Sequence, residues 1–142
     1  SFKETAGKTK IKAILGVGDL ETLRNVAKAS LVCMMAGADF IKTSTGKESI
    51  NANLNNSLVM LRMIRDFYIK TGKKIGFKPA GGISTAKSVL EFLILVAEEL
   101  GFEWVNPKLL RIGASSLLID IERQLYHYTS GRYANKEKLA IG

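Results

Sequence analysis

Two lysines follow apolar residues in two separate segments of the chain. Lys42 comes directly after Phe40 and Ile41, and Lys78 comes directly after Phe77. An ammonium group that points into an apolar interior is costly unless it is paired or loses its proton, and a second cation nearby favours that loss. A deprotonated lysine amine attacks carbonyl carbons and forms a Schiff base. We therefore predict that one of the two lysines is the nucleophile and that the other lowers the pKa of the first. The alternative is two lysines whose ammonium groups simply reach water.

Four loops are rich in glycine, small hydroxyl residues and lysine. Glycine lets backbone amides approach a ligand closely, and N–H groups at the start of a helix favour anions. Residues 78–82 and 113–116 lead into the last two expected helices, and a phosphate site at such loops is typical of (β/α) barrels. Taken together the loops predict a phosphate site, although each taken alone also suits a tight turn. The four loops are residues 16–19, 42–47, 78–82 and 113–116.

Two nucleotide-binding motifs use similar loops, and neither is present. In a P-loop built around Gly46, Ile41 would stand at the first required glycine and Glu48 at the required serine or threonine. In a dinucleotide fingerprint beginning at Gly16, Glu21 would stand at the third glycine. The phosphate-type loops therefore need another explanation.

Apolar segments and helical patterns alternate along the chain. This alternation predicts a parallel sheet with helices outside it, either an open doubly wound sheet or part of a barrel, with the functional loops at the C-terminal ends of the strands. Strands are expected at 11–17, 39–43, 75–78 and 109–112, and helices at 20–36, 54–70, 85–100 and 115–128. The expected N-caps are Asp19, Asn53 and Ser84, and the expected helix stops are Gly37, Gly72 and Gly101.

Composition excludes several classes of protein. The 142 residues have ordinary hydrophobic and charged content, which argues against disorder, and their net charge of +8 favours an anionic partner. Cys33 is the only cysteine, so neither an internal disulfide nor a multi-cysteine zinc site can form, and His127 lacks partners for a metal site or a catalytic triad. There is no membrane-length apolar run and no signal peptide. We expect a cytoplasmic protein with no metal, no cofactor and no membrane contact.

Three segments resemble the deoxyribose-phosphate aldolase family, and the resemblance runs over nearly the whole chain. They are residues 40–47 (FIKTSTGK), 76–83 (GFKPAGGI) and 111–118 (RIGASSLL). The resemblance implies a class I aldolase on a TIM (β/α)8 barrel, a carbon–carbon lyase that needs no metal. It also implies reversible cleavage of 2-deoxy-D-ribose 5-phosphate to D-glyceraldehyde 3-phosphate and acetaldehyde, in deoxyribonucleoside catabolism.

The resemblance also implies roles for individual residues. Lys42 matches the Schiff-base lysine, and Lys78 matches the second lysine that tunes it. The residues that match the loops on the phosphate side are Gly46, Lys47, Gly81, Gly82, Gly113, Ser115 and Ser116. The expected partner is a phosphorylated sugar.

The chain departs from the family in length. A TIM barrel takes about 250 residues and eight βα units, whereas this chain supplies about four, which match the last four strands. We therefore expect residues 1–142 to be the C-terminal half of a single barrel domain, with 131–142 as a basic polar tail. The family's catalytic aspartate would lie on an earlier strand. Asp19 is interpreted as a helix cap, Asp39 as lying at the wrong end of its strand, and Glu48 as a solvated loop residue.

Without that aspartate, we expect the isolated chain to be inactive and to need the missing N-terminal half or self-association to close the barrel. A second hypothesis is a non-catalytic basic half-barrel that binds phosphate ligands or nucleic acid. Nucleic acid is the weaker alternative because the basic residues are spread along the chain without a clustered stripe or interleaved aromatic residues.

Overall fold

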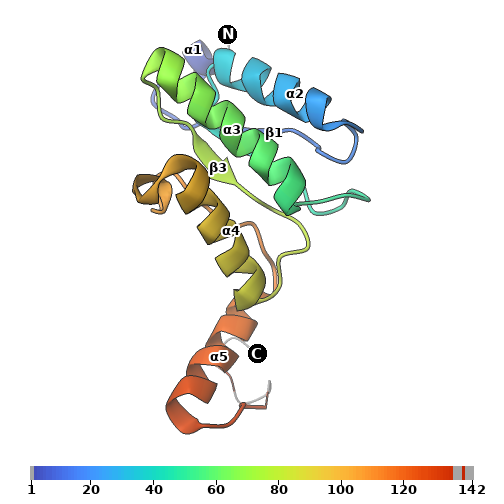
Figure 1. Ribbon diagram of the computed structural model, residues 1–142, viewed down its shortest axis with the longest axis vertical. Helices are drawn as coiled ribbons and strands as arrows, with labels where there is room; N and C mark the ends of the chain where they lie inside the picture. The colour runs from blue at the N-terminus through green and yellow to red at the C-terminus, as the bar shows by residue number, and fades with distance from the viewer. Residues whose placement is uncertain (1, 136–138, 140–142) are drawn as a thin grey trace.

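Three short parallel strands form the centre of the protein. In the computed structural model, which describes residues 2–135 and 139, the sheet order is β1 (Lys12–Ile14), β2 (Phe40–Lys42), β3 (Gly76–Lys78). Helices connect the strands, as parallel pairing requires. The helical elements are α1 (Phe2–Ala6), α2 (Leu23–Met35), α3 (Leu54–Thr71), α4 (Ala86–Leu100), the 3-10 turn η1 (Phe102–Trp104) and α5 (Leu117–Ser130). Figure 1 shows α5 projecting from the end of an elongated molecule.

The fourth expected strand, 109–112, is reduced to two isolated parallel bridges beside β3. Phe77 pairs with Leu110, and Ala80 pairs with Gly113. The backbone N–H of Phe77 donates to Leu109, and the N–H of Gly113 donates to Pro79. Pro79 lies between the bridges and has no N–H to donate, which interrupts the ladder. The fourth segment nevertheless keeps the parallel course that the sequence predicts.

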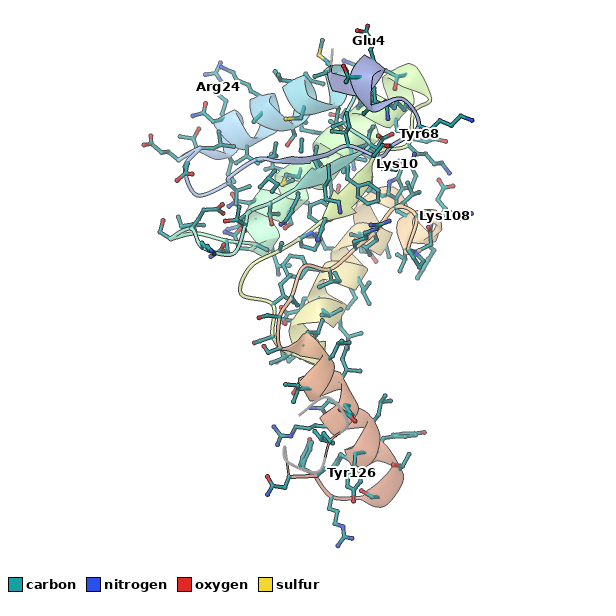
Figure 2. The ribbon with its side chains drawn as sticks, turned by 180° about the vertical axis from the view of Figure 1, so that it is seen from behind. Glu4, Lys10, Arg24, Tyr68, Lys108 and Tyr126 are labelled. Atoms are coloured by element: carbon teal, nitrogen blue, oxygen red, sulfur yellow. The ribbon has the colours of Figure 1, made fainter. Side chains whose placement is uncertain are left out.

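The two faces of the sheet have different surroundings. Ile41 and Phe77 point toward the helices and are fully buried with Met60, Leu61 and Ile64 of α3. Alternate residues point to the other face, which none of the described helices covers; Figure 2 shows the strands from that side. There Ile14 of β1 remains about half exposed. The core therefore lies between sheet and helices, and the opposite face is open.

Helix boundaries differ from the sequence predictions mainly at the N-termini. Asn53 caps α3 and Gly72 ends it, as predicted, and Gly101 ends α4. The expected caps Asp19 and Ser84 are wrong. Thr22 caps α2 by accepting the N–H of Asn25 at 3.1 Å, and Thr85 caps α4 in a capping box with Ser88. The backbone N–H of Asp19 instead donates to Gly16 in a turn. These shifts lengthen the loops that follow β1 and β3.

Trp104 secures the segment that returns the chain from α4 to the sheet. Its indole is buried, and Nε1 donates to the carbonyl of Ile75 at 3.0 Å. The ring of Tyr68 packs edge-on against it, with centroids 5.1 Å apart. A buried indole with a satisfied N–H is a strong local anchor. The Trp104 side chain thus holds the start of β3 against η1, and so helps to fix the position of β3, which carries Lys78.

Candidate active site

Lys42 and Lys78 are register partners on adjacent strands. The ladder pairs Phe40 with Gly76, Ile41 with Phe77, and Lys42 with Lys78. Residues at the same register in a parallel pair point to the same face, so both lysines project from the open face at the C-terminal ends of their strands. Both are half-buried. The structure brings the two predicted lysines together, as a pairing of their functions would require.

Cations and an aromatic ring surround this pair. Phe40 lies two residues before Lys42 on β2, so its side chain points to the same face. The Phe40 ring lies against Gly76, where an added Cβ would be only 2.3 Å from the ring. Lys12 Nζ lies 5.5 Å and Arg111 Cζ 5.3 Å from the centroid of that ring. Burial lowers the pKa of Lys78, and the positive charges of Lys12, Lys42 and Arg111 lower it further. Lys78 thus lies where an ammonium ion is destabilised.

A cleft of about 520 Å³ opens beside the lysine pair. Lys42 lines it, whereas Lys78 is not among its lining residues. All seven residues predicted for the phosphate side line it, namely Gly46, Lys47, Gly81, Gly82, Gly113, Ser115 and Ser116. Three loops that are far apart in sequence therefore meet at one concave surface that carries backbone amides, hydroxyls and an ammonium group.

Gly113 allows the third loop to approach the second. A Cβ at this position would lie 2.5 Å from Ala80 Cβ and 3.1 Å from Lys78 Cε. Gly113 also pairs with Ala80 as one of the two bridges. Only a residue without a side chain lets the 113–116 loop come this close to β3 and to the Lys78 stem.

Replacing Gly113 with alanine is expected to move this loop away from β3 and distort the Lys78 position. We expect a loss of about 1 to 3 kcal/mol in unfolding free energy from overpacking, and a KM for the phosphorylated substrate raised about tenfold or more. Urea denaturation and steady-state kinetics of the full-length protein measure both. Gly72→Ala is the control for KM: its Cβ meets open space, but its φ of 70° strains an alanine, so this variant should lose stability without a change in KM. An unchanged KM in Gly113→Ala would contradict the assignment of this loop.

Two buried hydroxyl residues of the 42–47 loop join the ends of β2 and β3, a structural role that the loop pattern did not predict. The Thr43 hydroxyl donates to the Ala80 carbonyl at 3.0 Å and accepts the Ala80 N–H at 2.9 Å. The Ser44 hydroxyl donates to the same carbonyl at 2.6 Å and lies 3.0 Å from Asn51 Oδ1. Buried polar groups with full partners hold their surroundings rigidly. This network fixes the two lysine-bearing strands relative to each other just beyond Lys42 and Lys78.

Glu48 is less exposed to solvent than the sequence predicted. It is half-buried, and its Oε1 accepts the backbone N–H and the hydroxyl of Thr45 at 3.0 and 2.9 Å. The hydrogen bond from the Thr45 backbone is the main cause that lowers the pKa of Glu48. Burial acts to raise this pKa, but the hydroxyls of Thr45 and Ser44 and the positive charge of Lys42 lower it overall. The three-residue spacing of Thr45 and Glu48 was the available signal, because it suits a side chain that closes its own turn.

Asp39 stands at the start of β2, away from the lysine ends of the strands, as predicted. It accepts Lys3 Nζ at 2.6 Å and the Ile11 N–H at 2.9 Å. Burial acts to raise the pKa of Asp39, but the hydrogen bonds from Lys3 and Ile11 and the charges of Lys10 and Lys3 lower it overall. Asp39 therefore ties α1 and the entry of β1 to β2 and has no place in the cleft.

No three His, Cys, Asp or Glu side chains among residues 2–135 and 139 are grouped so that they could hold a metal ion. No helix in the same residues is both long and apolar enough to span a bilayer.

A parallel βα sheet with paired lysines at the strand ends and a phosphate-type cleft defines a class of barrel aldolases that work through lysine. Residues 1–118 match the model of the DeoC/LacD family of aldolases. The chain belongs to this family.

Similar proteins are consistent with this placement. The chain is 64% identical over 133 residues to deoxyribose-phosphate aldolase of Mus musculus and 62% identical to that of Homo sapiens, in each case covering 94% of this chain and 42% of the relative. An apo structure of a candidate deoxyribose-phosphate aldolase from Toxoplasma gondii ME49 superposes with a TM-score of 0.76 at 22% identity. It covers 92% of this chain and 50% of that chain. The chain thus spans under half the length of these curated relatives, and its fold is part of a TIM barrel.

Proposed function

We propose that the protein to which this chain belongs cleaves 2-deoxy-D-ribose 5-phosphate reversibly to D-glyceraldehyde 3-phosphate and acetaldehyde, through a Schiff base on Lys42. One observation carries the proposal: Lys42 is both the register partner of Lys78 and a lining residue of the cleft that holds all seven predicted phosphate-side residues. The high identity to proteins named deoxyribose-phosphate aldolase supports the choice of substrate.

Lys42 is the proposed nucleophile because it lines the cleft and Lys78 does not. Its neutral amine attacks the aldehyde carbon of the sugar, and loss of water leaves an imine. The protonated imine then accepts the electron pair of the breaking carbon–carbon bond. The hydroxyl on carbon 3 loses its proton as this bond breaks, so that D-glyceraldehyde 3-phosphate leaves and an enamine remains on Lys42. A proton returned to the enamine carbon restores the imine, and water then adds to it and releases acetaldehyde and the free Lys42 amine.

Lys78 is proposed to tune this chemistry. Its pKa is lowered by burial and by the charges of Lys12, Lys42 and Arg111. The ammonium group of Lys42, at the same register, repels that of Lys78, so Lys78 gives up its proton at a lower pH than an isolated lysine. A readily exchanged proton beside the imine is what reversible proton transfer needs.

The cleft is proposed to hold the substrate phosphate. Backbone amides at Gly46, Gly81 and Gly82 and the hydroxyls of Ser115 and Ser116 are suited to phosphate oxygens, and Lys47 supplies a positive charge. A bound phosphate holds the aldehyde end of the sugar next to the Lys42 amine. The attack on the aldehyde then takes place within one bound complex, in a fixed orientation.

The open face of the sheet bears on the larger domain to which this chain belongs. We propose that residues 1–142 are the C-terminal half of one (β/α)8 domain, in which the open sheet face and the exposed Ile14 are covered by the other half or by a second copy of the chain. The basic tail at 131–142 lies partly outside the described residues. We expect the isolated chain to turn over little, and we propose a cytoplasmic location, consistent with a lone cysteine, Cys33.

The test is covalent trapping with acetaldehyde and borohydride on the full-length protein. Reduction of the imine should leave one ethyl group on the protein, and peptide mapping should place it on Lys42. With 2-deoxyribose 5-phosphate in place of acetaldehyde, borohydride should modify the same lysine, with either the whole sugar phosphate or the ethyl group that is left after cleavage. An ethyl group distributed over surface lysines, with Lys42 unmodified, would refute the proposed function.

A further inference from the structure

A second, smaller hollow adjoins the phosphate cleft where α5 begins beside the N-terminal end of α4 (Figure 1). It has a volume of about 220 Å³ and is lined by Ser84, Ser116, Ile119, Asp120 and Arg123. Ser84 and Ser116 also line the larger cleft, so the two spaces meet at these residues. The proposed function gives no role to Asp120 or Arg123, although both are charged and both face this hollow.

Arg123 is the residue in the hollow that is suited to bind an anion. Its Nε is buried and has no hydrogen-bond partner among the residues that the structure describes. A buried N–H group of a cation without an acceptor is costly. Arg123 stands seven residues after Ser116, which is two helical turns, so both lie on the same side of α5. Helical side chains lean toward the N-terminus of their helix, and in α5 that is the end at the cleft.

The guanidinium group of Arg123 is also held in place. The ring of Tyr133 lies 5.6 Å from Arg123 Cζ, so an aromatic face packs against the cation. A planar guanidinium that is already ordered loses less conformational entropy when it binds a phosphate than a free side chain does. The hollow therefore contains a positioned cation with an unused donor.

Asp120 weakens the attraction of the same hollow for a free anion. Its Oδ2 accepts the Ala86 N–H at 2.7 Å, which fixes the carboxylate at the start of α4. The negative charge of Asp120 opposes the positive charge of Arg123, so an anion that arrives alone gains little. An anionic group that is joined to a phosphate already bound in the cleft does not have this difficulty, because its effective concentration at the hollow is high.

We propose that this hollow is a subsite for a second phosphoryl group that is joined to the phosphate in the cleft. The ligand class is a diphosphate, and Arg123 donates to two oxygens of its second phosphoryl group. The hydroxyl of Ser116, which makes no hydrogen bond as the N-cap of α5, lies where the two phosphoryl groups meet. The inference rests on the proposed function, because it takes the cleft to hold the first phosphate.

The test is calorimetric titration of the full-length protein with inorganic phosphate and with pyrophosphate. The wild-type protein should bind pyrophosphate about tenfold more tightly than phosphate. Arg123→Gln should reduce this preference to about twofold and leave the affinity for phosphate within about twofold of the wild-type value. Arg132→Gln is the matched control, because it removes an exposed arginine just after α5 and should keep the full preference. The control is needed because any basic surface prefers the anion with the higher charge.

Asp120→Asn tests the subsite from the opposite direction. The asparagine keeps a side-chain oxygen for the Ala86 N–H but removes the negative charge that faces the second phosphoryl group. The affinity for pyrophosphate should rise about threefold or more, and the affinity for phosphate should rise less. A partly unfolded protein does not bind more tightly, so this result stays decisive even where Arg123→Gln folds poorly.

Three results would overturn the subsite. They are equal affinities of the wild-type protein for the two anions, a preference for pyrophosphate that survives in Arg123→Gln, and an affinity for pyrophosphate that does not rise in Asp120→Asn. None of these measurements uses the chemistry of Lys42. An absent borohydride adduct in the wild-type protein would refute the proposed aldolase function, whereas a preference that depends on Arg123 would still support the diphosphate subsite.

Discussion

Replacing Lys42 with methionine is expected to abolish the borohydride-trapped adduct and to lower kcat/KM for 2-deoxyribose 5-phosphate by about 10⁴-fold or more. Methionine keeps an unbranched stem in the half-buried position at the end of β2 but has no amine. Without the amine no imine forms, and the bond that breaks has no electron sink. Mass spectrometry after trapping and steady-state kinetics on the full-length protein measure the two effects.

Two further variants make the Lys42 experiment specific. Lys42→Arg retains a positive charge but not a nucleophilic amine, so it should be as inactive as Lys42→Met. Lys70→Met removes an exposed lysine from the last turn of α3 and should retain full activity. Substantial turnover by Lys42→Arg would show that charge, and not covalent chemistry, is what Lys42 supplies.

Replacing Lys78 with methionine is expected to lower activity by about 10²- to 10³-fold and at the same time to stabilise the fold at neutral pH. The activity falls because the second amine beside the imine is lost. The stability rises because the folded protein no longer contains an ammonium ion that burial and three neighbouring cations destabilise. Opposite changes in activity and stability would identify Lys78 as a residue retained for function.

The pH dependence of stability checks the sign of this effect. The pKa of Lys78 is lower in the folded protein than the ordinary value of 10.5. Between these two pKa values the unfolded chain binds more protons than the folded one, so stability rises with pH in that window. The destabilisation by Lys78 is fully present below the folded pKa and absent above 10.5. Lys78→Met should therefore flatten the pH dependence of the unfolding free energy in this window, measured by urea titration.

Lys73→Met provides the control for Lys78, because Lys73 is exposed in the turn before β3. It should change neither activity nor the slope of stability against pH. A Lys78→Met protein that is less stable than the wild type at neutral pH would mean that the Lys78 stem contributes more by packing than its charge costs. The proposal that burial and neighbouring cations destabilise the Lys78 ammonium group would then be wrong.

Local residue types predicted much of the fold. The alternation of apolar strands with amphipathic helices led to parallel βα units, and Asn53, Gly72 and Gly101 lie at the helix ends that their side chains, or lack of them, favour. The errors at Asp19 and Ser84 have one cause. In each place a second residue that can cap a helix follows, Thr22 three residues after Asp19 and Thr85 directly after Ser84, and the conformation of the preceding loop selects the second one.

The fourth strand shows where local reasoning stops. Residues 109–112 carry a clear strand pattern, but whether a ladder forms depends on the N–H groups that the neighbour offers. Pro79 of the neighbouring segment offers none between the two bridges. That information lies about thirty positions away in the sequence, and it becomes relevant only when the segments are side by side.

Residue types and their order were enough to predict which amines, amides and hydroxyls stand at the ends of the strands. Lysine amines, glycine amides and small hydroxyls at strand ends have their properties wherever they lie, and a parallel βα order puts such ends on one edge of a sheet. How these groups lie relative to one another follows only from the folded chain. Lys42 and Lys78 stand at one register, and Lys12 and Arg111 lie against the ring of Phe40. The reason is physical, because burial and the field of neighbouring charges depend on distances between segments that no local pattern contains.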